Sequence, residues 1–319
     1  MIRLSFNENP FGFPKQILER VIEDIDPEEI ARYTDAPIPE LSDELVRYIR
    51  DTSRVDFIDE RWISITSGSD EGITILMSMR PKRVVLFPPT YFCYYNYAKG
   101  MGLNYVEFYL VNDKSIPQVE LEEGDMVFVP NPNNPTGHMF SAEEIERLLK
   151  SPALIVLDEA YFEFSWVSSI SFLRKYDNLL ILRTFSKAFA FAGQRFGYVI
   201  AHPHMIEKFN SYKQTYNVGV LTQKLALEAL KNRWLFFGMI KEIEMERERM
   251  REAIEDMGLE VFPSYTNFLY FKVENAHDVQ RALFERGVEV RALWGGIRVS
   301  VGKKEENDEF IKALREIIR

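Results

Sequence analysis

A lysine in an unusual setting gives the first indication of chemistry. Lys187 follows a strand-like run at 178–182 and lies among hydroxyls, small residues and aromatics, with Arg195 eight positions later. An amine in an apolar pocket beside another cation has its ammonium form disfavoured, so it can attack an aldehyde. Thr184, Ser186 and Arg195 add two hydroxyls and a planar guanidinium, which suit a phosphate. The segment therefore predicts a lysine that reacts with the aldehyde of pyridoxal phosphate. The simpler alternative is that Lys187 is a surface residue and that Arg195 forms an ion pair with a carboxylate.

Two further polar loops follow strand-like runs. The run at 127–129 leads into a loop with three prolines, which fix the backbone that aims Asn134. The run at 153–157 ends on Asp158, and Tyr161 supplies a phenol three residues later. Open α/β sheets bind ligands beyond the carboxyl ends of their strands, so we expect these side chains and Lys187 to meet at one site. Asp158 alone would otherwise be interpreted as a helix N-cap.

The order and spacing of these segments resemble those of the fold-type I pyridoxal-phosphate aminotransferases. The run Thr184-Phe185-Ser186-Lys187-Ala188-Phe189-Ala190 is similar to their class II signature. Four more segments resemble the histidinol-phosphate aminotransferase branch: Asn7-Glu8-Asn9-Pro10, Ser67-Gly68-Ser69-Asp70-Glu71, Phe87-Pro88-Pro89-Thr90-Tyr91 and Gly296-Ile297-Arg298-Val299-Ser300-Val301-Gly302. The resemblance covers essentially the whole chain. It implies pyridoxal 5′-phosphate as cofactor and an α/β fold, with a large domain built on a mostly parallel sheet flanked by helices and a smaller α+β domain.

The resemblance also implies roles for individual residues. Lys187 would bind the cofactor covalently through an imine, and Asp158 would face the pyridine nitrogen and keep it protonated, so that the ring can withdraw electrons. Asn134 and Tyr161 would donate hydrogen bonds to the ring's phenolate oxygen. Tyr91 would stack on the ring, although ordinary core packing explains an aromatic residue there equally well.

The cofactor phosphate is expected to have a second anchor besides Thr184, Ser186 and Arg195. Ser69 and Asp70 follow a strand-like run at 62–66 and open an apolar helical segment. A helix that begins there directs free backbone N–H groups and its positive dipole end at an anion, and Ser69 can cap the helix as well. By resemblance, Tyr33 would reach the phosphate from a neighbouring subunit, which implies a homodimer.

Two arginines near the C-terminus point to an anionic substrate. Arg298 lies on a strand-like run at 297–301, and Arg291 is seven residues earlier. The planar guanidinium fork binds a carboxylate or a phosphate monoester through paired hydrogen bonds. A surface ion pair is the alternative for Arg291. The resemblance adds Asn9, from the N-terminal motif, to the predicted substrate-binding residues.

The resemblance implies amino-group transfer between L-histidinol phosphate and 2-oxoglutarate, in histidine biosynthesis. That branch usually carries a Pro-Tyr element before the Asn-Glu-Asn-Pro motif, whose tyrosine contacts the substrate phosphate, and residues 1–6 contain none. An aromatic or broad-specificity aminotransferase and a threonine-phosphate decarboxylase are therefore close alternatives. A non-catalytic module that holds the cofactor, such as the effector domain of a transcription regulator, is a remote one.

Composition narrows the partners and the compartment. A net charge of −10 without a basic run argues against nucleic acid and anionic membranes, and favours small-molecule substrates. One cysteine, Cys93, and no apolar run of signal-peptide or membrane length indicate a cytoplasmic protein. The four histidines are scattered, so we predict no metal site.

The chain's 319 residues suffice for about two domains. We predict a large domain at 31–233 and a small domain formed by 1–30 and 234–319. Alternating strand-like and helical runs indicate a largely parallel sheet in the first. The expected strands lie at 62–66, 83–87, 104–110, 125–129, 153–158, 178–182, 196–201, 266–273 and 297–301, and the C-terminal helices at 234–257, 277–286 and 305–318.

Overall fold

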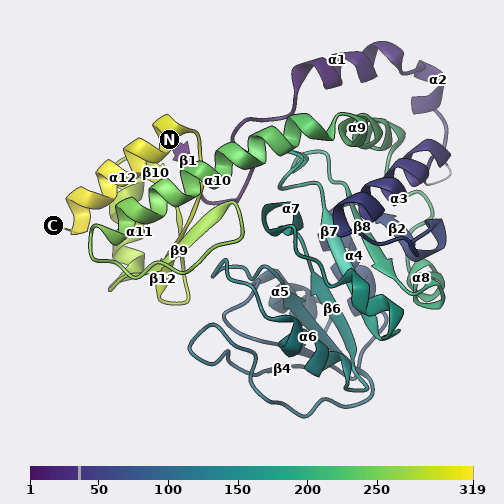
Figure 1. The fold of residues 1–319 in the computed structure, drawn as a ribbon, viewed down its shortest axis with the longest axis horizontal. Coiled ribbons are helices and arrows are strands. Elements are labelled where there is room, and N and C mark those ends of the chain that lie inside the picture. Colours follow the sequence, from purple (N-terminus) through teal and green to yellow (C-terminus); the bar gives the residue numbers. More distant parts are fainter. Residues whose placement is uncertain (35–36, 319) are drawn as a thin grey trace.

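A seven-stranded sheet forms the centre of the larger part of the molecule in the computed structural model, which describes residues 1–34 and 37–318 (Figure 1). Its strand order is β2-β8-β7-β6-β5-β3-β4. Strand β8 runs antiparallel to β2 and β7, and the other neighbouring pairs are parallel. The strands are β2 (Ile63–Thr66), β3 (Arg83–Leu86), β4 (Tyr105–Glu107), β5 (Asp125–Pro130), β6 (Leu154–Asp158), β7 (Leu179–Thr184) and β8 (Gly197–Ala201). This confirms the predicted α/β class with a mostly parallel sheet.

The central strands β5, β7 and β8 are buried along their whole length, and β6 is buried after its first residue, because mostly apolar side chains point to both faces of the sheet. Side chains alternate between faces with a period of two, so Val127 and Leu157 belong to one core cluster while Phe128 and Val156 belong to the other. The second cluster is covered by α4 (Gly68–Ser78), α5 (Cys93–Gly100) and α8 (Pro203–Asn210). The first is covered by α3 (Pro39–Ser53), α6 (Ala142–Leu149) and α9 (Val220–Lys231).

A long helix, α10 (Arg233–Glu255), connects the large sheet to the C-terminal part of the chain (Figure 1). There β11 (Arg291–Leu293), β12 (Gly296–Ser300) and β9 (Phe268–Lys272) form an antiparallel sheet in that order. Two helices, α11 (Ala276–Glu285) and α12 (Lys304–Ile318), pack against each other beside it. Every strand expected from the sequence is present, with ends that differ by at most three residues.

The N-terminal residues contact both parts of the molecule. Strand β1 (Ile2–Arg3) pairs in parallel with β10 (Val288–Glu289) of the C-terminal part. Helix α1 (Lys15–Asp24) and the short α2 (Pro27–Ile30) instead pack against α9, beside the large sheet. The predicted domain limits, 31–233 against 1–30 with 234–319, stay a prediction.

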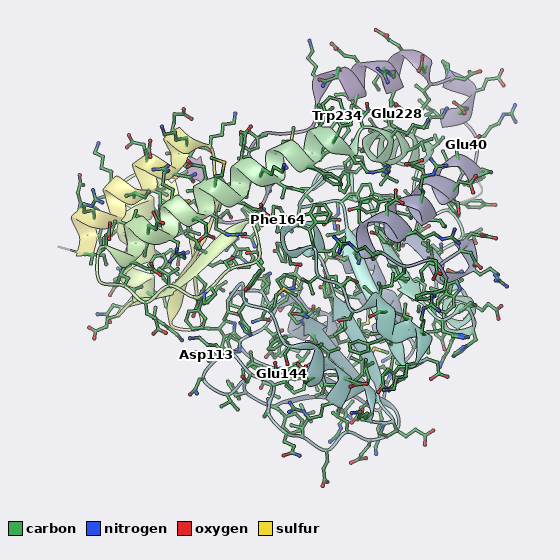
Figure 2. All side chains as sticks on the ribbon, viewed as in Figure 1. Glu40, Asp113, Glu144, Phe164, Glu228 and Trp234 are labelled. Carbon is green, nitrogen blue, oxygen red and sulfur yellow. The ribbon has the colours of Figure 1, made fainter. Side chains whose placement is uncertain are left out.

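Two contacts hold the parts together around the ends of the strands. In Figure 2, Phe164 of the short helix α7 (Phe162–Ser165) lies beneath α10, against which α7 packs. Asp113, in the loop after β4, accepts a hydrogen bond of 2.8 Å from Nζ of Lys272 on β9. Within residues 1–34 and 37–318, no helix is long and apolar enough to cross a membrane, and no cluster of three or more His, Cys, Asp or Glu side chains could hold a metal ion.

Candidate active site

The carboxyl ends of β5, β6 and β7 open into a cavity of about 300 Å³. The N-terminal segment and strands β11 and β12 close its other side. Twelve of the fourteen predicted site residues line it: Lys187, Asp158, Tyr161, Asn134, Ser69, Asp70, Tyr91, Thr184, Ser186, Arg195, Arg291 and Arg298. Asn9 and Tyr33 are outside the lining.

Lys187 follows β7 and points into this cavity. Its Nζ donates a hydrogen bond of 3.1 Å to the carbonyl oxygen of Phe6 in the N-terminal segment. Enclosure by the protein lowers the pKa of Lys187 to about 8, and the charge of Arg298 acts in the same direction. The folded chain therefore keeps a much larger fraction of neutral amine near neutral pH than an exposed lysine does.

Asp158 ends β6 as a buried carboxylate. Its Oδ2 accepts a hydrogen bond of 2.8 Å from Tyr94, and its Oδ1 accepts one of 3.1 Å from the backbone N–H of Ala160. Burial raises the pKa of Asp158 to about 6, against the lowering effect of these hydrogen bonds. The N-cap of the following helix is Tyr161, so the capping alternative for Asp158 is wrong. A buried carboxylate of this kind suits a cationic ring nitrogen.

Asn134 and Tyr161 are both arranged as hydrogen-bond donors. Oδ1 of Asn134 accepts a hydrogen bond of 2.8 Å from Nη1 of Arg298. This leaves the Asn134 amide N–H groups without an acceptor among the described residues. Oη of Tyr161 accepts a hydrogen bond of 2.9 Å from Nδ2 of Asn7, which leaves the phenol proton available. Burial raises the pKa of Tyr161 to about 12, so the phenol stays protonated. The two donors fit an anionic ring oxygen.

The start of α4 and the loop after β7 form a cradle for an anion. Arg195 donates from Nη1 to Oγ of Ser186 at 3.1 Å and from Nη2 to Oδ2 of Asp70 at 3.1 Å. Gly68 has φ +75°, and a Cβ there would lie 2.5 Å from Nη2 of Arg195. The glycine thus lets the guanidinium approach the N-terminus of α4, where backbone N–H groups and the helix dipole favour a phosphate.

Arg298 and Arg291 face each other across β11 and β12 and both line the cavity. Arg298 is only 7% exposed, and its Nη2 donates a hydrogen bond of 2.7 Å to the carbonyl oxygen of Ser5. Its Nε is buried without a partner in the described residues. The guanidinium lines the cavity and has N–H groups beyond those that it gives to Asn134 and Ser5, which suits an anionic group of a substrate.

The model of the family "Aminotransferase class I and II" matches residues 1–314. The chain belongs to this family. Its cofactor is therefore pyridoxal 5′-phosphate, and its reaction is amino-group transfer. The residues present fit that cofactor at each position: a lysine for the aldehyde, a carboxylate for the pyridine nitrogen, two donors for the phenolate and a cradle for the phosphate.

This aminotransferase is similar to histidinol-phosphate aminotransferases and also to a decarboxylase. Histidinol-phosphate aminotransferase of Thermotoga maritima is 42% identical over 313 residues, which are 98% of this chain and 92% of that protein. Histidinol-phosphate aminotransferase from Sinorhizobium meliloti, solved in complex with pyridoxal-5′-phosphate, has a TM-score of 0.84 at 24% identity, covering 99% of this chain and 90% of that one. L-threonine-O-3-phosphate decarboxylase from Porphyromonas gingivalis has a TM-score of 0.82 at 21% identity, covering 99% of each chain. The two structures show the fold alone, and the fold does not separate transamination from decarboxylation.

Three predicted residues have positions in the aminotransferase that leave their roles open. Tyr91 lines the cavity with its hydroxyl 3.4 Å from Oδ1 of Asp70, and its stacking on the cofactor stays a prediction. Asn9 is buried outside the cavity, where its Nδ2 donates 3.0 Å to the carbonyl oxygen of Ala188, next to Lys187. Tyr33 is 83% exposed and stacks on Tyr216 at a ring distance of 4.5 Å, away from the cavity of its own chain.

The aminotransferase also has site residues that sequence reasoning did not identify. Asn7 holds Tyr161, and Tyr94 holds Asp158. Asn7 belongs to the N-terminal motif quoted above, which was a usable signal, whereas nothing about Tyr94 distinguished it from neighbouring aromatics. Other cavity residues that were not predicted are Ser5, Phe6, Phe92, Pro130 and Ala160.

Proposed function

We propose that this aminotransferase transfers the amino group of L-histidinol phosphate to 2-oxoglutarate, a step of histidine biosynthesis. The observation that carries the proposal is the 42% identity along 98% of the chain with histidinol-phosphate aminotransferase of Thermotoga maritima. The paired arginines support it, since Arg291 and Arg298 line the same cavity as Lys187. A phosphate monoester and a carboxylate both present paired anionic oxygens, so one arginine can serve both substrates.

The residues of the cavity divide into those that hold the cofactor and those that act on the substrate. Arg195, Ser186, Thr184 and the N-terminus of α4 would hold the phosphate, Asp158 the pyridine nitrogen, and Asn134 with Tyr161 the phenolate oxygen. When bound, the cofactor supplies a conjugated, electron-withdrawing ring that makes the Cα–H bond of the substrate acidic.

Lys187 is the group placed to move that proton. Its pKa, lowered to about 8, makes the neutral amine much more accessible near neutral pH than in an exposed lysine, and in the proposed cycle Nζ accepts the proton from Cα of the amino donor. Arg298 orients the donor by its anionic group, which keeps Cα within reach of Lys187. With a 2-oxo acid the same residues act in reverse, so the cycle alternates between the two substrates.

A single-turnover panel tests the assignment of the substrate. The enzyme loaded with pyridoxal phosphate is mixed with histidinol phosphate, an aromatic amino acid, glutamate or threonine phosphate, and its visible absorbance is followed. We expect histidinol phosphate to convert the absorption band at least about 100-fold faster than the aromatic donor, because its phosphate offers more charge and more acceptor oxygens to Arg298 and Arg291 than a carboxylate does. No conversion by histidinol phosphate, or release of carbon dioxide from threonine phosphate, would overturn the proposal and leave only the cofactor chemistry.

We also propose that the enzyme is a cytoplasmic homodimer. Tyr33 and Tyr216 are exposed on the surface and stacked on each other, which supports a contact there with a second subunit. The single cysteine fits a reducing compartment.

A further inference from the structure

Asn7 is held rigidly at the edge of the cavity. It is 1% exposed and has a left-handed backbone with φ 55°, a conformation that asparagine tolerates better than most residues. Its backbone N–H donates a hydrogen bond of 2.8 Å to Oγ of Ser300, and its carbonyl oxygen accepts one of 2.9 Å from Nδ2 of Asn267. Four long-range hydrogen bonds, counting the one to Tyr161 and the one from the Ser300 hydroxyl, therefore fix this residue against the C-terminal part and the segment after β6.

The hydroxyl of Ser300 determines which way the Asn7 amide faces. Oγ of Ser300 already accepts a hydrogen bond from the backbone N–H of Asn7. The hydroxyl donates its single proton to Oδ1 of Asn7, with 2.9 Å between the two oxygen atoms. The described residues offer this buried proton no other acceptor. With the amide reversed, the proton would face an N–H group and stay unsatisfied. Oδ1 therefore faces Ser300, and Nδ2 faces Tyr161.

The direction of the next hydrogen bond follows from this orientation. Nδ2 of Asn7 can only donate, so Oη of Tyr161 accepts at 2.9 Å. The phenol proton of Tyr161 is then left for an acceptor inside the cavity, because no described residue takes it. A hydroxyl that accepts one hydrogen bond becomes a stronger donor in the next.

We propose that Asn7 and Ser300 are positioning residues that fix Tyr161 as a hydrogen-bond donor to the phenolate oxygen of the cofactor. The inference rests on the proposed function, in which Tyr161 faces that oxygen. Ser300 lies two residues after Arg298 on the same face of β12. One strand thus holds the substrate's anion and sets the direction of a donor to the cofactor.

The pH dependence of the cofactor's visible absorption tests the proposal. A donor to the phenolate stabilises the anion, so a weaker donor raises the pH midpoint at which the visible band changes. Asn7→Gly tolerates the left-handed backbone and removes Nδ2. We expect its midpoint to rise by about half to one pH unit and its kcat to fall about tenfold, with a much smaller change in KM.

A matched control separates this effect from a change of backbone. Asn275 has φ 52°, is exposed, precedes α11 and is not among the residues that line the cavity. Asn275→Gly makes the same substitution in the same conformation and should leave the midpoint unchanged. Ser300→Ala frees the Asn7 amide to turn and should shift the midpoint in the same direction as Asn7→Gly, which also provides a second variant if Asn7→Gly does not fold.

A double-mutant cycle decides whether the effect passes through Tyr161. In a Tyr161→Phe background, Asn7→Gly should cause no further shift, because the proton that Asn7 directs is gone. Equal shifts in both backgrounds, or a midpoint of Asn7→Gly within about 0.2 pH unit of wild type, would overturn the inference. A wild-type protein with no visible band after loading would instead overturn the proposed function.

Discussion

Arg298 donates a hydrogen bond of 2.8 Å from Nη1 to Oδ1 of Asn134, a residue 164 positions away in the chain. The bond links β12 to the loop after β5, the two segments that we propose face the substrate and the cofactor. It also fixes the Asn134 amide with its nitrogen toward the cavity. Because a guanidinium has five N–H donors, Arg298 can hold Asn134 and Ser5 and still have N–H groups left for an anion.

Lys187→Ala should abolish turnover while the protein still folds. The substitution removes the amine that we propose binds the cofactor covalently and accepts the Cα proton, so we expect kcat to fall by at least about 10⁴-fold. Stability should not suffer, because the depressed pKa of Lys187 shows that its charged form is disfavoured in the folded state. Steady-state kinetics and thermal unfolding measure the two effects, and a variant that keeps most of the wild-type rate would contradict the role of Lys187.

Asp158→Asn should stabilise the cofactor-free protein and impair the enzyme. The pKa of Asp158 is raised from 3.8 to about 6, so between these values the folded protein keeps a proton that the unfolded chain has released. The free energy of unfolding therefore falls as pH rises through this window, and the full penalty applies above pH 6. We expect the variant to gain about 1–3 kcal/mol at pH 7 and nothing below about pH 4.

Urea unfolding at pH 7, 5 and 4 measures that gain, and kinetics measure the cost. Without the carboxylate the pyridine nitrogen loses its partner, so kcat should fall by at least about 100-fold. A variant less stable than wild type at pH 7 would show that Asp158 is not a strained buried charge in the free protein.

Gly68→Ala should weaken cofactor binding more than it affects stability. A Cβ there would lie 2.5 Å from Nη2 of Arg195, and the end of that flexible side chain can move aside at little cost to the fold. Moving it takes the guanidinium away from the phosphate cradle, so we expect Kd for pyridoxal phosphate to rise at least about tenfold. Gly258→Ala is the control: it has φ +82° and open space around it, so it carries the backbone strain alone. Equal Kd values for the two variants would show that displacement of the Arg195 guanidinium does not weaken cofactor binding.

The sequence was sufficient to predict the strands of the large sheet and the polar residues at or shortly after their carboxyl ends. Lys187, Asp158 and Asn134 each follow an apolar strand, and parallel strands bring their carboxyl ends to one edge. The motif at 7–10 marked Asn7 but not its partner, and nothing marked Tyr94, because their hydrogen bonds to Tyr161 and Asp158 span 154 and 64 positions of the chain. Strands β1, β10 and β11 were not predicted, because two or three residues are too few to show a periodicity.

Tyr33 should matter for the cofactor only through the dimer. Its exposed hydroxyl lies away from the cavity of its own chain, so Tyr33→Phe should leave thermal stability unchanged. If it reaches the phosphate of a second subunit, Kd for pyridoxal phosphate should rise about three- to tenfold. Tyr212→Phe, at a tyrosine that is also exposed, is the control. Sedimentation that finds a fully active monomer would exclude the contact.

Arg298→Ala should reduce kcat/KM by at least about 1,000-fold in both half-reactions, because the anionic group of each substrate loses its buried partner. Arg298→Lys should recover little of this loss, since an ammonium lacks the planar fork and cannot hold Asn134 and an anion together. Arg291→Ala is the comparison. Its guanidinium lines the cavity with no hydrogen bond to Asn134, so its loss should raise KM for the phosphorylated donor more than it lowers kcat. Measuring the half-reactions separately distinguishes the arginines: equal losses for Arg291→Ala and Arg298→Ala would mean that the link to Asn134 contributes nothing beyond charge.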